Sequence, residues 1–222
     1  MCFAGCPDTP SDAAAWHAAR GRPVFPCDPR TKAPLVREGF HAATLDPVQI
    51  REWWVRWPNA MIGCPTNEVS GLHVIDIDRK GGDPDEILDE LSRKYDLPQT
   101  LLVATAGGGY HLYFHAHPGV RRAIRAIHPA VDTLGEGGFV ILPPSRTVDG
   151  RQYRLVHDAD PIDMPDDLLA ACMSGQRERP ALTAIEGGVA QLPYYAEDLA
   201  LWRSLDEPGR WHESQRSLVA RY

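Results

Sequence analysis

Helical periodicity is clearest in the segment between Asp46 and Pro58. Ile50, Trp53, Trp54 and Trp57 recur there at i, i+3, i+4 and i+7, which places four large apolar side chains on one face of a helix. Aromatic residues can also stack on nucleic-acid bases. Because helical spacing is typical of core residues, we interpret this face as core.

Helix-start signals occur at three places. Asp-Pro-Val-Gln at 46–49 and Asp-Pro-Asp-Glu at 83–86 each combine a cap, a proline at the first helical position and a capping-box residue. Ser11 is the expected cap of a helix over 12–20, which Gly21 ends. The acidic cluster at 83–86 is therefore explained as a helix start, and we exclude it as a metal-ligand set.

Short apolar runs separated by Gly, Pro and Asn predict strands. The segment 100–116 is expected to form a hairpin around three glycines, and 130–146 repeats this arrangement with a more polar first strand. The remaining strands are expected at 22–27, 59–66, 71–78 and 150–157, with a closing helix at 161–174. The polar segment 117–129 between the two glycine-containing motifs is interpreted as a loop.

The chain is expected to form one domain followed by an appendage. Periodicity ends after residue 174, and 175–193 has the Gly, Arg, Glu and Ala composition of a linker. Residues 194–222 are predicted to be helical. The expected organisation is a catalytic domain over 1–174, a linker over 175–193 and a helical C-terminal segment over 194–222.

The composition is that of an ordinary globular protein, 43% hydrophobic and 24% charged. No apolar run is long enough to span a bilayer and the N-terminus does not resemble a signal peptide, so a cytoplasmic location is expected. Five cysteines without a CxxC pair fit a reducing compartment and argue against structural zinc. The net charge of −7 argues mildly against a nucleic-acid partner.

Two aspartates on one predicted strand are the most unusual polar feature. Asp76 and Asp78 are two residues apart, so their side chains project from the same face while Val74, Ile75 and Ile77 anchor the strand. Like charges this close raise each other's pKa unless a cation lies between them. A metal ion, a basic side chain or water alone could satisfy the pair, and a solvated strand edge is the simplest alternative.

Two further motifs add candidate chemistry. His111 follows Gly108 and Gly109 just inside a strand, and Asp132 lies on the short polar strand of 130–146. Two carboxylates with a distant third form a ligand set suited to two-metal phosphoryl transfer. Glycines before His111 would let backbone N–H groups approach phosphate. Taken singly, each motif also fits a core histidine, an ordinary turn or a turn aspartate.

The order of the motifs resembles the bifunctional DNA primase/polymerase N-terminal domain, the prim-pol branch of the archaeo-eukaryotic primase superfamily. The resemblance covers roughly residues 14–170. It runs through "AARGRPVFPCDPRTKAPL", "ATLDPVQIREWWVRWPNAMIG", "SGLHVIDIDRKGG", "TAGGGYHLYF" and "VDTLGEGGFVILPPS" and ends at "DGRQYRL".

This resemblance implies a fold and a set of site residues. The implied fold is an α/β (α+β) primase-polymerase fold, in which an N-terminal α/β layer packs on an RRM-like mixed sheet that carries the active site. The residues are implied as follows: Asp76, Asp78 and Asp132 as ligands of Mg²⁺ or Mn²⁺, His111 as the triphosphate contact, Ser145 as part of the nucleotide pocket and Lys32 as a recurrent basic position without an assigned role.

The implied activity is primer synthesis, template-directed DNA polymerisation or both, by a two-metal mechanism. The implied partners are a DNA template and primer and nucleoside triphosphates, with no membrane. A helicase module or protein is a further candidate partner, although the sequence contains no P-loop of the form GxxxxGK[ST]. A non-catalytic nucleic-acid-binding module and a metal-dependent nuclease remain the alternatives.

The sequence departs from the family pattern at two positions. Asn67 replaces a usual turn glycine, a change that the left-handed tolerance of Asn permits, and Leu134 stands where the family tends to have Arg. Basic residues in 117–129 answer the objection from net charge in part. Arg121 and Arg122, with Arg125 and His128 nearby, are expected either to contact triphosphate or template, or to form a solvated loop.

Overall fold

The computed structural model describes residues 3–175. The predicted linker over 175–193 and helical segment over 194–222 therefore lie outside the described residues, apart from Gly175. The elements in chain order are α1 (Pro10–Ala18), β1 (Phe25–Cys27), η1 (Gly39–Ala42), α2 (Pro47–Arg56), β2 (Met61–Thr66), β3 (Leu72–Ile77), η2 (Arg79–Gly81), α3 (Pro84–Lys94), β4 (Leu102–Ala104), β5 (Tyr110–His115), β6 (Ala123–His128), β7 (Val131–Leu134), β8 (Gly138–Leu142), β9 (Arg154–His157) and α4 (Asp166–Ser174).

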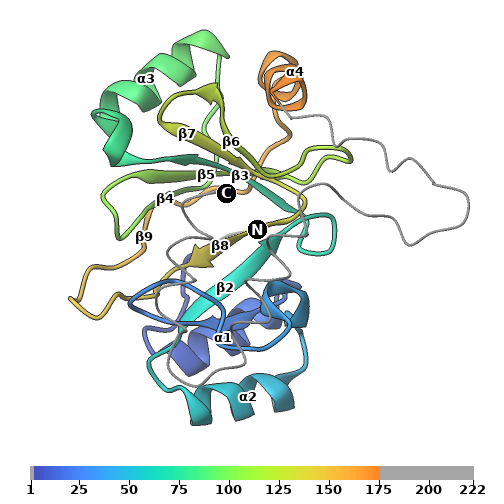
Figure 1. Ribbon diagram of the computed structural model, residues 1–222, viewed down its shortest axis with the longest axis vertical. Coiled ribbons are helices and arrows are strands. Elements are labelled where there is room, and N and C mark those ends of the chain that lie inside the picture. The colour runs from blue at the N-terminus through green and yellow to red at the C-terminus, as the bar shows by residue number, and fades with distance from the viewer. Residues whose placement is uncertain (1–2, 176–222) are drawn as a thin grey trace, which may run out of the picture. The chain divides into compact units, whose positions relative to one another are not determined.

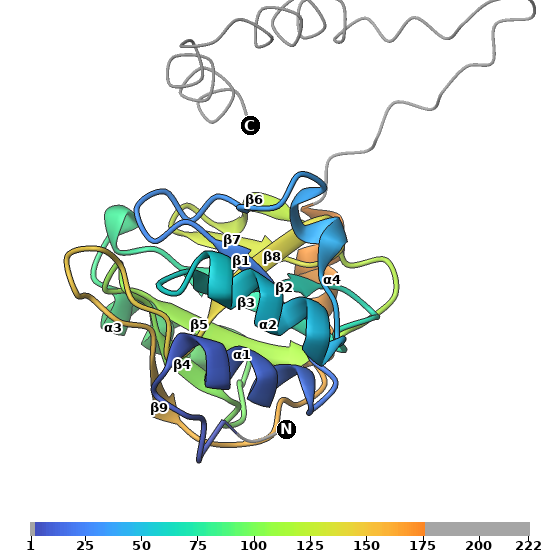
Figure 2. The ribbon, with the colours of Figure 1, turned by 90° about the horizontal axis from the view of Figure 1, so that it is seen from below.

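The elements form four layers (Figure 1). A three-stranded sheet, β1-β2-β8, faces a six-stranded sheet, β6-β7-β3-β5-β4-β9. Helices α1 and α2 cover the outer side of the small sheet, as Figure 2 shows from below, and α3 and α4 cover the outer side of the large sheet. The α/β fold with an N-terminal layer on a larger sheet is confirmed, and the structure has the α+β composition expected of a primase-polymerase fold.

The large sheet differs from the mixed sheet that the sequence predicted. Every pairing between its named strands is antiparallel. The segment 130–146 also differs from a simple hairpin, because β7 pairs with β3 and β6 whereas β8 pairs with β2 in the small sheet. One continuous segment therefore belongs to both sheets.

Two hydrophobic cores lie on the two sides of the large sheet. Val74 of β3 belongs to the core between the sheets, whereas Ile75 and Ile77 belong to the core beneath α3 and α4. The alternation of β3 thus fixes which side chains face the small sheet. Trp54 is buried in the first core, and Trp53 and Trp57 pack against it, which confirms the core interpretation of that helix face.

The helix-start predictions were right for two helices and wrong for one. The carboxylate of Asp46 accepts a hydrogen bond from Val48 N and that of Asp83 accepts one from Asp85 N. The first helix begins at Pro10, with Thr9 rather than Ser11 at the cap position. Proline fits the first helical position, because the N–H that it lacks would have no intrahelical partner there.

The basic segment predicted as a loop contains an edge strand instead. β6 pairs with β7 at Ala123↔Thr133 and at His128↔Val131, with an irregular register between these two points. An irregular edge strand shows no clean alternation of apolar and polar residues, which is why the sequence pattern did not reveal it.

Trp54 offers a test of the core between α2 and the small sheet. Its side chain is 2% exposed and its indole N–H donates to the carbonyl oxygen of Ala60 at 3.3 Å. Trp54→Ala should lower the free energy of unfolding by about 3–5 kcal/mol in denaturant titrations, because it leaves a cavity. Val55→Ala, at the neighbouring exposed position, should change it by less than about 0.5 kcal/mol. Similar losses in the two variants would contradict this packing.

Candidate active site

Three of the predicted site residues lie side by side across the large sheet. Asp76 of β3 pairs in register with His111 of β5 on one side and with Asp132 of β7 on the other. Directly opposed side chains of an antiparallel sheet project from the same face, with Cβ atoms about 4.5–5.5 Å apart. Since Val74 and Tyr113 on that face belong to the core between the sheets, the three polar side chains face the small sheet.

His111 is a neutral side chain next to a carboxylate. Its Nε2 lies 3.5 Å from Oδ1 of Asp76, and its side chain is 6% exposed. Burial, with a smaller contribution from the Lys32 charge, lowers the pKa of His111 to about 3. Its Nδ1 is buried and has no hydrogen-bond partner among the described residues. At neutral pH the ring therefore has no charge and carries one proton.

The surroundings of Asp76 disfavour the charged form of its carboxyl group. Burial, together with the charges of Asp132 and Asp78, raises its pKa to about 7, and the positive charge of Lys32 opposes this shift. The side chain nevertheless keeps 31% of its surface exposed, so an ion from solvent can reach it. A carboxylate in this setting gains from any cation that binds beside it.

Backbone amides hold the other two carboxylates. Oδ1 of Asp78 accepts from Lys80 N at 3.1 Å, just past the end of β3, and Oδ1 of Asp132 accepts from Arg125 N at 3.0 Å. Each of these side chains therefore has one oxygen in a hydrogen bond to the main chain.

The three carboxylates are of the right chemical type to bind divalent metal ions, but their side chains do not form a complete coordination site. Among residues 3–175, no three His, Cys, Asp or Glu side chains are arranged closely enough to hold a metal ion as they stand. Carboxylate oxygens are the ligands that Mg²⁺ and Mn²⁺ prefer. Burial and the charges of Asp132 and Asp78 raise the pKa of Asp76, and a divalent ion would relieve the repulsion between these carboxylates.

The glycines before His111 shape the turn between β4 and β5. A Cβ atom on Gly109 would lie 1.9 Å from the carbonyl oxygen of Ile77, so only glycine lets β5 start this close to the end of β3. The N–H of Gly109 donates to the Thr105 hydroxyl and that of Gly108 to the Thr105 carbonyl. Both amides donate within the turn, and their approach to phosphate stays a prediction.

Ser145 lies within the structural framework. It is 4% exposed, and its hydroxyl oxygen accepts from Ile62 N of β2 at 2.8 Å. Its carbonyl oxygen accepts from Tyr153 N. The side chain thus connects β2 to the segment that follows β8, and its place in a nucleotide pocket stays a prediction.

Arg121 and Arg122 lie beside the connection between β7 and β8 rather than in a free loop. Nε of Arg121 is 3.8 Å from a carboxylate oxygen of Glu136, and Arg122 N donates to the Glu136 carbonyl. Their role in nucleotide binding stays a prediction.

Lys32 and Tyr153 reach the acids from outside the large sheet's central strands. Lys32 has a left-handed backbone, with φ +64°, in a loop that Asp28 closes by accepting from Arg30 N. The Lys32 ammonium lies 5.5 Å from the centroid of the Tyr153 ring, and its charge lowers the pKa of both Asp76 and His111. The sequence marked Lys32 without a role and did not mark Tyr153, because only the folded chain brings these two residues to the acids.

The Lys32 charge, the neutral His111 and the carboxylate of Asp76 act on one another electrostatically in the folded protein. The sequence comparison identifies the family. The chain belongs to the family described as bifunctional DNA primase/polymerase, N-terminal, which it matches over residues 14–167. No similar protein was found among curated proteins. Within the part of the chain that the structure describes, no helix is long and apolar enough to cross a membrane.

The raised pKa of Asp76 predicts how stability depends on pH. In the folded protein the group holds a proton from its ordinary pKa of 3.8 up to about 7, so its contribution to the free energy of unfolding falls as pH rises across that range. Without divalent ions, Asp76→Asn should therefore be more stable than the wild type at pH 8 and nearly equal to it at pH 4.5, as measured by chemical denaturation. Asp89→Asn, an exposed change on α3, should keep the wild-type pH dependence. If the free energy of unfolding of Asp76→Asn fell with pH as steeply as that of the wild type, the raised pKa of Asp76 would be contradicted.

Proposed function

We propose that the chain transfers nucleotides onto a DNA primer or onto a first nucleotide, in a metal-dependent reaction directed by a template. The observation that carries this proposal is the register of His111, Asp76 and Asp132 across three adjacent strands on one face. Family membership supports the reaction class, because the family is that of DNA primase/polymerase N-terminal domains.

In this proposal Asp76, Asp78 and Asp132 hold two divalent ions, Mg²⁺ or Mn²⁺. Bound ions would supply Lewis-acid activation of the attacking 3′-hydroxyl and charge stabilisation for the departing pyrophosphate. The three carboxylates place their negative charge where these ions are needed. Burial and the neighbouring carboxylates, which together raise the pKa of Asp76, favour a site with bound ions over an empty one.

His111 and Lys32 would bind the triphosphate from two sides. The neutral His111 ring carries one N–H donor for a phosphate oxygen, and its burial fixes the direction of that donor. Lys32, in the loop that follows β1, adds a positive charge that already acts on Asp76 and His111. Both groups would stabilise a triphosphate bound at the site.

The first test is incorporation of labelled nucleotides on primed and on unprimed templates with Mg²⁺ or Mn²⁺. Asp76→Asn and Asp132→Asn should each lower incorporation by at least about 100-fold, because each removes a charge that binds metal. Asp89→Asn, on the helix that covers the opposite face of the sheet, should keep wild-type activity.

The outcomes also separate the alternatives. Degradation of the template without incorporation would identify a nuclease, and DNA binding without either reaction would identify a non-catalytic module. Wild-type incorporation by both Asn variants would remove the metal role of the carboxylates.

The second test separates His111 from the acids. His111→Ala should weaken apparent nucleotide affinity by roughly 10- to 150-fold, since a hydrogen bond to a charged group contributes about 1.5–3 kcal/mol. The Mn²⁺ midpoint measured without nucleotide should stay unchanged. His115→Ala, at the exposed end of the same strand, is the matched control. A shifted Mn²⁺ midpoint with unchanged nucleotide affinity would instead make His111 a metal ligand.

A further inference from the structure

Arg125 has a backbone conformation that glycine would adopt more easily. Its φ is +54°, and Lys32 and Asp96 are the other non-glycine residues with positive φ among residues 3–175. Left-handed backbone brings Cβ close to the following carbonyl oxygen, which glycine avoids. A large side chain kept at such a position points to a function of that side chain.

The conformation of Arg125 belongs to the irregular part of β6. Five residue steps along β6, from Ala123 to His128, correspond to two steps along β7, from Thr133 to Val131. The extra β6 residues bulge outward opposite Asp132. At this bulge the Arg125 N–H donates to Oδ1 of Asp132 at 3.0 Å instead of pairing with a strand carbonyl. The backbone of Arg125 is thus one hydrogen bond away from a candidate metal ligand.

The guanidinium of Arg125, like that of Arg122, has no acidic partner among the described residues, whereas two other cations of this segment lie near carboxylates. Arg121 lies 3.8 Å from a Glu136 carboxylate oxygen, and His128 lies 4.0 Å from one of Glu90. Arg122 donates its N–H to the Glu136 carbonyl, beside the connection between β7 and β8. Arg125 is exposed and, within the described part of the chain, forms no salt bridge.

The acids create a need for such a cation. A DNA strand whose 3′ end approaches Asp76 and Asp132 brings its phosphates toward clustered carboxylates on a chain of net charge −7. Guanidinium groups bind phosphate through paired N–H donors. An arginine whose main-chain N–H contacts Asp132, and whose guanidinium has no acidic partner among the described residues, can meet this charge locally.

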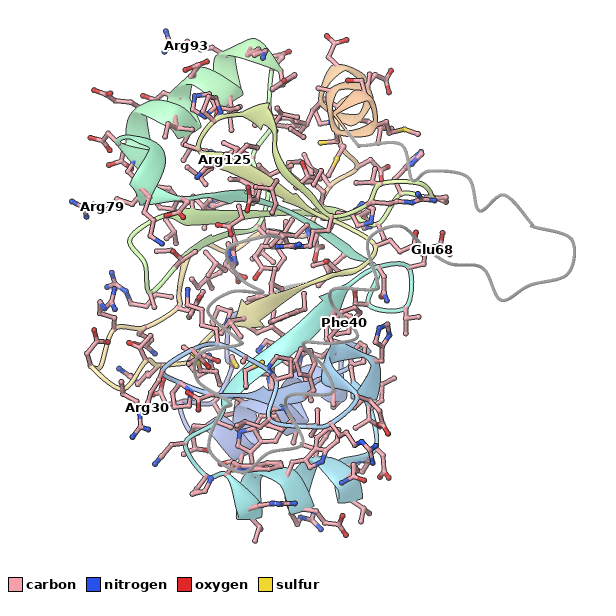
Figure 3. The ribbon with its side chains drawn as sticks, viewed as in Figure 1. Arg30, Phe40, Glu68, Arg79, Arg93 and Arg125 are labelled. Atoms are coloured by element: carbon pink, nitrogen blue, oxygen red, sulfur yellow. The ribbon has the colours of Figure 1, made fainter. Side chains whose placement is uncertain are left out.

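We propose that Arg125 contacts a backbone phosphate of the DNA strand in the active site, and that the β6 bulge holds it beside Asp132 for this purpose. The proposal rests on the proposed function, and it assigns one side chain to the nucleic acid rather than to the metals or the nucleotide. Figure 3 labels Arg125 near the strands of the large sheet and Arg93 on α3 at the top of the view.

The test compares Arg125→Gly with Arg125→Lys in DNA binding, measured by fluorescence anisotropy with a primed template between 50 and about 300 mM salt. Arg125→Gly keeps the N–H that holds Asp132 and removes only the side chain. It should bind about two- to fivefold more weakly and lower the slope of log K against log salt by about 0.7–0.9, the value for one phosphate contact. Arg125→Lys should restore the slope.

Two matched control variants test whether the loss of any exposed cation, or the relief of any left-handed backbone, is enough to change DNA binding. Arg93→Ala removes an exposed cation from α3, whose Nε donates to the Asp89 carbonyl, and should keep the wild-type slope. Asp96→Gly relieves a left-handed residue in the turn after α3, and should also leave DNA binding unchanged. The thermal midpoint of Arg125→Gly should equal or exceed that of the wild type, because glycine fits the bulge.

The Mn²⁺ midpoint, measured without DNA, separates this proposal from a structural or metal role. It should be the same in Arg125→Gly and in the wild type. An unchanged salt slope, or a shifted Mn²⁺ midpoint with unchanged DNA affinity, would overturn the proposal. Since DNA binding is measured without turnover, a wild type that binds DNA but incorporates no nucleotide would contradict the proposed function and leave the Arg125 result interpretable.

Discussion

Strand β3 is paired on both sides, and this constraint determines the candidate site. Because side chains alternate along β3, Val74 packs in one core and Ile75 and Ile77 pack in the other. A shift of the strand register by one residue would move each of these side chains to the opposite face of the sheet. That register is therefore strongly fixed. Asp76 consequently faces the small sheet, between His111 and Asp132, and the apolar residues of β3 set the geometry of the polar ones.

The same register concentrates negative charge that the described residues compensate only in part. Asp132 and Asp78 both raise the pKa of Asp76, His111 is neutral, and Lys32 alone among the causes of that shift acts against it. A protein can keep such a cluster when ligand binding removes the repulsion, and stability in the absence of ligand is lower as a result. The left-handed backbones of Lys32 and Arg125 lie at the same site and add local strain there.

Local signals in the sequence predicted most of the elements and the principal acids. The caps at Asp46 and Asp83, the helix face of Trp54 and the hairpin around Gly108 each depend on a few neighbouring residues, and the structure contains all of them. The pairing of strands and the contacts between distant segments could not be predicted in this way. Contacts between residues far apart in the sequence place β7 and β8 in different sheets. Such contacts also bring Lys32 and Tyr153 to Asp76. The β6 strand escaped prediction because its bulge interrupts the pattern that marks a strand.

The segment shared by the two sheets has a consequence for how the protein is made. The small sheet needs β8, which follows β7 in the sequence, so its third strand is synthesised long after β1 and β2. On the ribosome, α1 and α2 could already cover the outer face of β1 and β2, whereas the inner face of these strands would stay exposed at least until residues 138–142 were synthesised. Tyr153 follows later still. The core between the two sheets is therefore completed only after residue 153 has been synthesised, and a nascent chain interrupted before that point would expose the interior of the site to chaperones and proteases.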